Sequence, residues 1–146
     1  MTMLNWNTVM QASLLGMVIV ASWQDMKFRI ISNRLVLTGA LMGLGFATTP
    51  NAHGIGSAFV SSILVFMSFL ALHLAGWLGA GDVKLAAAAG TYFPASEALI
   101  LSLIIMITGG LVCLFWSAWP WTDKRKGIPY AVSIGLGVLL YLWSRN

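Results

Sequence analysis

Four long stretches of this chain contain no charged side chain, and this feature restricts its possible folds more than any other. Asp, Glu, Lys and Arg are absent from residues 1–24, 35–81, 98–122 and 127–144. Only 8% of the residues are charged, whereas a soluble domain has about 25%. A membrane-spanning helix needs about 20 apolar residues, while barrel strands are shorter and alternate polar with apolar residues. The sequence therefore predicts an all-α, polytopic membrane helix bundle that forms a single domain over residues 1–146.

Charged and turn-forming residues divide the apolar stretches into about six expected transmembrane segments. We expect them at about residues 6–24, 35–49, 54–77, 83–93, 97–118 and 128–144. The fourth segment is short, because at 1.5 Å per residue it would reach only about 16 Å. The first is expected to be a retained helix and not a signal peptide, since no Lys or Arg precedes Lys27.

The basic residues fall almost entirely on one side of this predicted topology. The loops at 25–34, 78–84 and 120–127 contain seven of the eight: Lys27, Arg29, Arg34, Lys84, Lys124, Arg125 and Lys126. Because Lys and Arg collect in cytoplasmic loops, we expect these three loops to face the cytoplasm. The net charge of +4 is explained by this bias, and it does not indicate that the chain binds nucleic acid.

Two aspartates on that same predicted side are the candidate functional residues. Asp25 and Asp82 each lie at the end of an apolar stretch, in a chain with only four acidic residues. An ionisable group at such a place is a functional-site hypothesis. A structural alternative is that both are solvated loop residues, neutralised by Lys27 and Lys84. Two carboxyls that share one proton can instead provide both the base and the acid that peptide hydrolysis needs.

The expected helices suggest how the two carboxyls would divide these roles. Asp82 is expected to start the fourth helix, where the helix dipole favours a carboxylate, and Asp25 to follow the end of the first, where it does not. We therefore expect Asp82 to be the ionised base and Asp25 the protonated acid. Cys113 is the single cysteine, and the chain has two histidines. These three residues are too few to form a structural zinc site. We expect no metal and no other cofactor, and no Ser or Cys lies beside an obvious base for nucleophilic catalysis.

Three short motifs, in order along the chain, resemble those of the type IV prepilin peptidases, which are membrane aspartyl proteases with a Gly-x-Gly-Asp motif. The first motif has Asp25, Lys27, Ile31 and Asn33 at the family spacing, with Ser32 where the family has proline. The second matches in full at Gly79, Gly81, Asp82 and Lys84. The third is the Pro-Tyr pair Pro129-Tyr130 after Ile128.

The resemblance implies that Asp25 and Asp82 are the catalytic pair. It implies substrate-binding or dyad-supporting roles for Lys27, Asn33, Gly79, Gly81, Lys84, Pro129 and Tyr130. Longer members carry a cytoplasmic domain with paired cysteines, which this chain lacks between its first two segments, so it is similar to the short peptidases of Flp or tight-adherence pili and to preflagellin peptidases. No methyltransferase activity is implied.

The implied substrate is a prepilin or pseudopilin precursor, whose basic leader would be removed at the cytoplasmic face of the bacterial inner membrane. Membrane lipid is the other expected partner, and the oligomeric state is left open. Two alternatives remain. One is an aspartyl intramembrane protease of other helices, although such enzymes have Tyr-Asp where this chain has Gln24-Asp25. The other is a non-enzymatic transporter or assembly subunit, although its acids would more often lie in mid-span.

Overall fold

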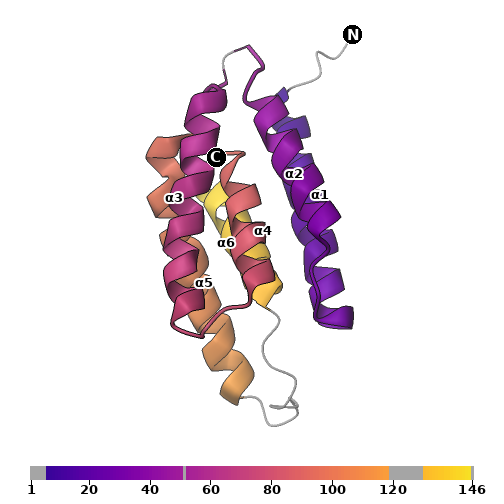
Figure 1. Ribbon diagram of the computed structural model, residues 1–146, viewed down its shortest axis with the longest axis vertical. Coiled ribbons are helices and arrows are strands. Elements are labelled where there is room, and N and C mark those ends of the chain that lie inside the picture. Colours follow the sequence, from indigo (N-terminus) through magenta and orange to yellow (C-terminus); the bar gives the residue numbers. More distant parts are fainter. Residues whose placement is uncertain (1–5, 51, 119–129, 146) are drawn as a thin grey trace.

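The computed structural model describes residues 6–50, 52–118 and 130–145, and these residues form a helical bundle (Figure 1). Within them the chain has six α-helices, one short 3₁₀ helix (η1) and no strand, which confirms the all-α prediction. In chain order the elements are α1 (Trp6–Phe28), α2 (Asn33–Phe46), α3 (Ile55–Leu74), α4 (Ala80–Gly90), η1 (Ala95–Glu97), α5 (Ala98–Ala118) and α6 (Tyr130–Arg145).

The helix α4 lies inside the bundle, surrounded by longer helices. It packs against α2, α3 and α6, with further contacts to α1 and α5. Six of its eleven residues are buried, and four of these six are alanine or glycine. Because these residues are small, the neighbouring helices can approach closely. A Cβ atom on Gly90 would lie 3.1 Å from the Ser62 backbone of α3. The segment expected to be short is therefore a buried half-length helix, and its neighbours supply the outer surface.

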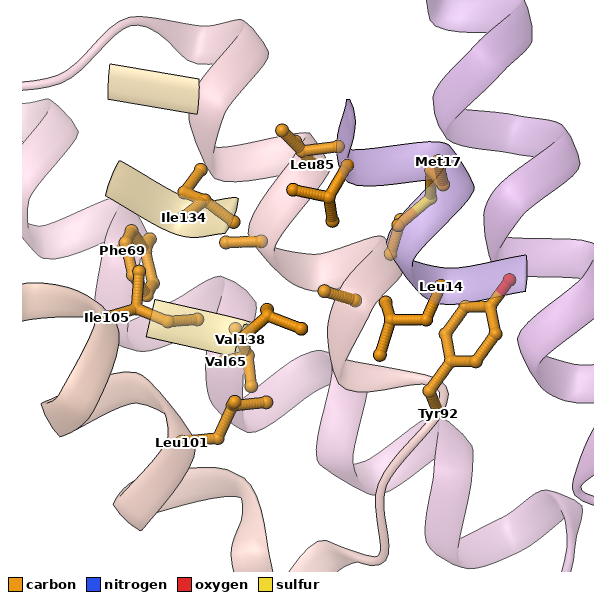
Figure 2. Packing of buried hydrophobic residues seen from close by; sticks show 14 of the residues in the cluster. Leu14, Met17, Val65, Phe69, Leu85, Tyr92, Leu101, Ile105, Ile134 and Val138 are labelled. Carbon is orange, nitrogen blue, oxygen red and sulfur yellow. The ribbon is translucent and has the colours of Figure 1, made fainter. Parts of the chain in front are cut away.

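The core forms where these helices meet along the axis of the bundle. Large buried side chains from α1, α3, α5 and α6 surround α4 (Figure 2); they include Leu14, Phe69, Leu101, Ile105 and Ile134, and Leu85 of α4 is buried with them. The outer surface is also apolar: for example, Leu74 is 78% exposed and Trp143 is 79% exposed. Such a surface is unfavourable in water and favourable against lipid.

Two helical segments are long and apolar enough to cross a membrane. They are Ile55–Leu74 and Ala95–Ala118, and Tyr130–Arg145 is a shorter apolar helix. The structure thus agrees with a membrane bundle, while the expected number of six spans stays a prediction. The basic loop expected at 120–127 lies outside the described residues.

Candidate active site

Three helix ends meet at one end of the bundle, and they bring the candidate residues together. Figure 1 shows the C-terminal end of α1 and the N-terminal ends of α4 and α6 at the lower end of the molecule. These ends carry Asp25, Asp82 and Tyr130 respectively. Residues far apart in the sequence therefore share one region, on the side where the topology placed both aspartates.

Asp25 lies within α1 and not after it, which differs from the expected position. The helix continues to Phe28 because hydrogen bonding extends beyond the apolar run, with the Arg29 amide donating to the Asp25 carbonyl at 3.0 Å. The Asp25 side chain is only 9% exposed. Its Oδ2 atom accepts the backbone N–H of Ala131 at 3.2 Å, in the first turn of α6. A carboxylate is unfavourable near the C-terminal end of α1, where the helix dipole is negative, and the positive N-terminal end of α6 offsets this effect on Asp25.

Asp82 occupies the first turn of α4, as expected, and it is held by Gly79. Its own amide donates to the Gly79 carbonyl at 3.2 Å, and its carboxylate receives a hydrogen bond from the Gly79 backbone. The bond to the carboxylate corresponds to one half of a capping box, in which the side chain of the third helical residue reaches back to the amide of the capping residue; the other bond joins the two backbones. A Cβ atom on Gly79 would lie 3.1 Å from Asp82 Oδ2, so glycine allows the carboxylate to sit this close.

The surroundings of Asp82 make its carboxyl easier to protonate. Asp82 precedes the expected membrane segment, at the polar end of the bundle. Burial, and to a smaller extent the negative charge of Asp25, raise its pKa from 3.8 to about 6, although the Gly79 hydrogen bond acts in the opposite direction. The two carboxyls are thus close enough to affect one another. Burial and Asp25 thus oppose the helix dipole, which favours an ionised Asp82, and the expected roles of Asp82 as base and Asp25 as acid stay a prediction.

The turn before Asp82 is fixed by residues that the sequence motifs do not include. Gly76 has a φ of +80°, which lets α3 end in a left-handed turn. The Trp77 amide then donates to the Leu72 carbonyl at 3.0 Å. The His73 ring nitrogen Nδ1 lies 2.7 Å from the Leu78 carbonyl oxygen, so His73 supports the residue that directly precedes Gly79.

The loop after α1 connects the first motif to the second. The Ser32 amide donates to Gln24 Oε1 at 3.0 Å, and Lys84 Nζ donates to Asn33 Oδ1 at 3.3 Å. Gln24 entered the sequence argument only as the neighbour of Asp25, because a glutamine carries no signal of a contact eight residues away. Its contact with Ser32 makes it a supporting residue of the site.

Lys27 points away from this arrangement. It is exposed, and its Nζ atom lies 4.9 Å from the centre of the Trp23 ring on the outer face of α1, a cation–π contact. Among the described residues neither Lys27 nor Lys84 forms an ion pair with Asp25 or Asp82, so the structural alternative of two lysine-neutralised aspartates gains no support from them. Pro129 lies outside the described residues.

A cavity of about 430 Å³ opens beside Asp82, between α3, α5 and α6. Its walls include Asp82, Tyr130 and Cys113. The Tyr130 ring fits there because residue 109 is glycine: a Cβ atom on Gly109 would overlap the Tyr130 side chain. No cluster of three or more His, Cys, Asp or Glu residues that could hold a metal ion occurs in the part of the chain that the structure describes.

The comparisons with known proteins give one match. The family model of the type IV leader peptidase family matches residues 12–114, a range that contains both Asp25 and Asp82. No curated protein and no solved structure matches the chain significantly.

Proposed function

The chain belongs to the type IV leader peptidase family, and from this premise we propose that it is a membrane aspartyl endopeptidase in which Asp25 and Asp82 are the catalytic pair. The observation that carries the proposal is the position of these two carboxyls at the same end of the bundle, near enough to interact electrostatically. The two aspartates are 57 positions apart in the sequence, yet the charge of Asp25 raises the pKa of Asp82. Such a coupled pair can hold a single proton between its members.

The pair can hydrolyse a peptide bond without a covalent intermediate. The ionised carboxylate takes a proton from water, and the water oxygen bonds to the scissile carbonyl carbon. The protonated carboxyl gives its proton to the carbonyl oxygen, which forms a neutral diol. As the diol collapses, one of its hydroxyls returns its proton to the carboxylate that had donated it and the carbonyl forms again. The C–N bond breaks, and the proton taken from water passes from the other carboxyl to the leaving nitrogen. Because like charges in close proximity resist double ionisation, one proton stays available to the pair.

The substrate that suits this site is a precursor with a basic leader and an apolar helix. We place the site at the cytoplasmic face of a bacterial inner membrane, because the basic residues Arg29, Arg34 and Lys84 lie in or beside its loops. The apolar exterior of the bundle offers a surface in lipid for the precursor helix, while the leader junction extends to the carboxyl pair. Type IV prepilins and pseudopilins have this form. The exposed Lys84, held by Asn33, orients the loop beside Asp82 and helps to bind the extended junction.

The test is cleavage of a co-expressed candidate prepilin by wild-type enzyme and by Asp25→Asn and Asp82→Asn. Each change keeps the size of the side chain and removes its ionisable group. We expect both variants to lose leader removal by a factor of at least about 10³, since each carboxyl has its own step. The leader junction is read by mass spectrometry, which also maps the cleaved bond.

Glu97→Gln is the matched control. The Glu97 carboxylate accepts a hydrogen bond from the Tyr141 hydroxyl at 2.6 Å and forms a salt bridge with Arg145 at 3.4 Å. Neither partner belongs to the proposed site. Its neutralisation should leave cleavage within about twofold of wild type at equal membrane levels. Full cleavage by either aspartate variant would exclude that residue from the mechanism and favour a non-enzymatic role for it.

A further inference from the structure

The peptide group between Leu78 and Gly79 has a hydrogen bond at each end, and the two bonds connect His73 to Asp82. At one end, the His73 ring nitrogen Nδ1 lies 2.7 Å from the Leu78 carbonyl oxygen. At the other end, the Asp82 carboxylate accepts a hydrogen bond from the Gly79 backbone, whose single donor is its N–H. Because a peptide group is planar, its C=O and N–H turn together, and a side chain that holds the carbonyl also orients the N–H.

We infer that His73 is a positioning residue of the proposed reaction, which holds the Leu78 carbonyl and thereby orients the Gly79 N–H toward the Asp82 carboxylate. The inference rests on the proposed function, since it gives His73 a role in preparing one of the two proposed catalytic carboxyls. A carbonyl oxygen can only accept a hydrogen bond, so Nδ1 carries the proton of this bond. His73 is therefore the donor, whatever the state of its other ring nitrogen.

The turn between α3 and α4 makes this peptide group dependent on a side chain. The end of α3 is closed by the Trp77 amide, and the first turn of α4 is closed by amides that donate to the Gly79 carbonyl. Between them, no backbone N–H of the described residues donates to the Leu78 carbonyl. Leu78 is buried, and an unpaired carbonyl there would be unfavourable. Without the His73 ring, we expect the peptide group to turn toward another partner.

The orientation of this peptide group affects the chemistry of Asp82. The Gly79 hydrogen bond lowers the pKa of Asp82, because an N–H that donates to a carboxylate favours the ionised form. Hydrogen bonds in a chain strengthen one another, so the donor on the Leu78 carbonyl increases this effect. His73 lies on α3 and can be changed without altering the titratable side chains of other helices that lie near Asp82. These are Asp25, Cys113 and Tyr130.

Three substitutions separate the hydrogen bond of His73 from the size of its side chain. His73→Asn places an amide nitrogen where the ring has Nδ1, because both atoms are bonded to Cγ, so it can donate to the Leu78 carbonyl. His73→Gln carries its amide one bond further out, near the position of the other ring nitrogen, and His73→Leu has no donor. None of the three is charged at any pH, so the comparison of Asn with Leu isolates the bond.

The first measurement is the titration of Asp82 in the purified full-length protein in detergent, by NMR of ¹³C-labelled aspartate carboxyls. The chain has three aspartates, Asp25, Asp82 and Asp123, and Asp82→Asn identifies the signal. We expect His73→Leu and His73→Gln to raise the pKa of Asp82 by about 0.5, and His73→Asn to keep it within about 0.2 of wild type. An unchanged pKa in His73→Leu, or an equal rise in all three variants, would overturn the positioning role.

The second measurement is cleavage of the purified candidate prepilin, with kcat and KM determined separately. His73→Leu should lower kcat about tenfold and leave KM within about twofold, because a displaced carboxyl slows the reaction more than it weakens binding. His73→Asn should keep kcat within about threefold of wild type. A loss of the same size in both variants would overturn the positioning role while the peptidase proposal stands. If wild type cleaves nothing, the peptidase proposal fails and the positioning role fails with it.

His53→Leu is the matched control. His53 is the other histidine of the chain, and it has a hydrogen bond to the backbone of Thr91 at the opposite end of α4. The substitution thus removes a comparable bond from the same helix, about nine residues or roughly 14 Å from Asp82. It should leave the pKa of Asp82 within about 0.2 of wild type. A rise equal to that in His73→Leu would mean that any loosening of α4 changes Asp82, and it would overturn the specific role of His73.

Discussion

At the residue scale, the two glycines of the Gly-x-Gly-Asp motif have different surroundings. A Cβ atom on Gly79 would lie 3.1 Å from Asp82 Oδ2, whereas one on Gly81 would meet the Ile31 side chain at 3.5 Å, an ordinary contact. Gly79→Ala should therefore displace the carboxylate and lower kcat/KM about tenfold or more, because small misplacements of a catalytic group are costly. Gly81→Ala should fold normally and serve as the paired comparison. An equal loss in the two variants would show that close approach of the substrate, and not the position of Asp82, explains the motif.

The raised pKa of Asp82 predicts a pH dependence of stability. A carboxyl with a pKa of about 6 in the folded protein, against 3.8 ordinarily, binds protons more readily when folded. Its favourable contribution is complete below pH 4 and is lost as the pH rises through about 6. Above that pH, Asp82→Asn should raise the free energy of unfolding by about 1–2 kcal/mol after allowance for partial exposure, and this gain should vanish near pH 4.

Thermal unfolding in detergent between pH 4 and pH 8 measures this effect. Asn keeps the oxygen that accepts the Gly79 hydrogen bond, so the comparison isolates the charge. Glu97→Gln serves as the control acid and should not reproduce the change in slope around pH 6. A stabilisation by Asp82→Asn that is the same at every pH would mean that the charge of Asp82 is not its source.

At the element scale, the loop between α1 and α2 explains how this chain manages without the proline expected in its first motif. Ser32 has a φ of −65°, the value that a proline ring imposes, so its backbone already has the required shape. The Ser32 amide, which a proline would lack, donates to Gln24 Oε1. The glutamine therefore holds in place a turn that a proline would have fixed covalently.

Ser32→Pro should accordingly have an effect that depends on residue 24. In the wild-type background, reduced freedom of the unfolded chain adds about 0.4–1 kcal/mol, and the lost hydrogen bond removes about 0.5–1.5 kcal/mol, so the net change should be near zero. In a Gln24→Ala background no such bond remains to be lost, and Ser32→Pro should stabilise by about 0.4–1 kcal/mol. Unfolding of the four proteins forms a double-mutant cycle, and additive effects would contradict the coupling.

At the scale of the whole molecule, the distribution of basic residues predicts which end faces the cytoplasm. In a Cys113→Ser background, we expect Ala75→Cys, in the turn before the second motif, to react with a membrane-impermeant maleimide only after the inner membrane is opened. Thr48→Cys lies between α2 and α3 and should react in intact spheroplasts. Both positions are exposed. The reverse pattern would place the carboxyl pair on the outer face and contradict the proposed access to a cytoplasmic leader.

The apolar stretches and the charged residues of the sequence are sufficient to predict the general features of the fold. They predict a helical bundle and bring Asp25 and Asp82 to one side, because apolar length and basic loops are read directly from the residues. They place the end of the first helix at residue 24, whereas α1 ends at Phe28, since a helix can continue through polar residues. The contacts of Gln24 and His73 depend on the shapes of the turns that follow α1 and α3, and the contact of Gly109 with Tyr130 depends on how α5 and α6 pack. No pattern in the sequence encodes these contacts.

The hydrogen bond from Ala131 to Asp25 has a consequence for the biosynthesis of the protein. It joins the first helix to α6, so a ribosome must translate more than a hundred intervening codons before Asp25 acquires this partner. The half-length α4 is likewise too short to be stable in lipid before α5 and α6 emerge to cover it. If the proposed pair is catalytic, we therefore expect a nascent chain that contains both carboxyls to stay inactive until its sixth helix has joined the bundle.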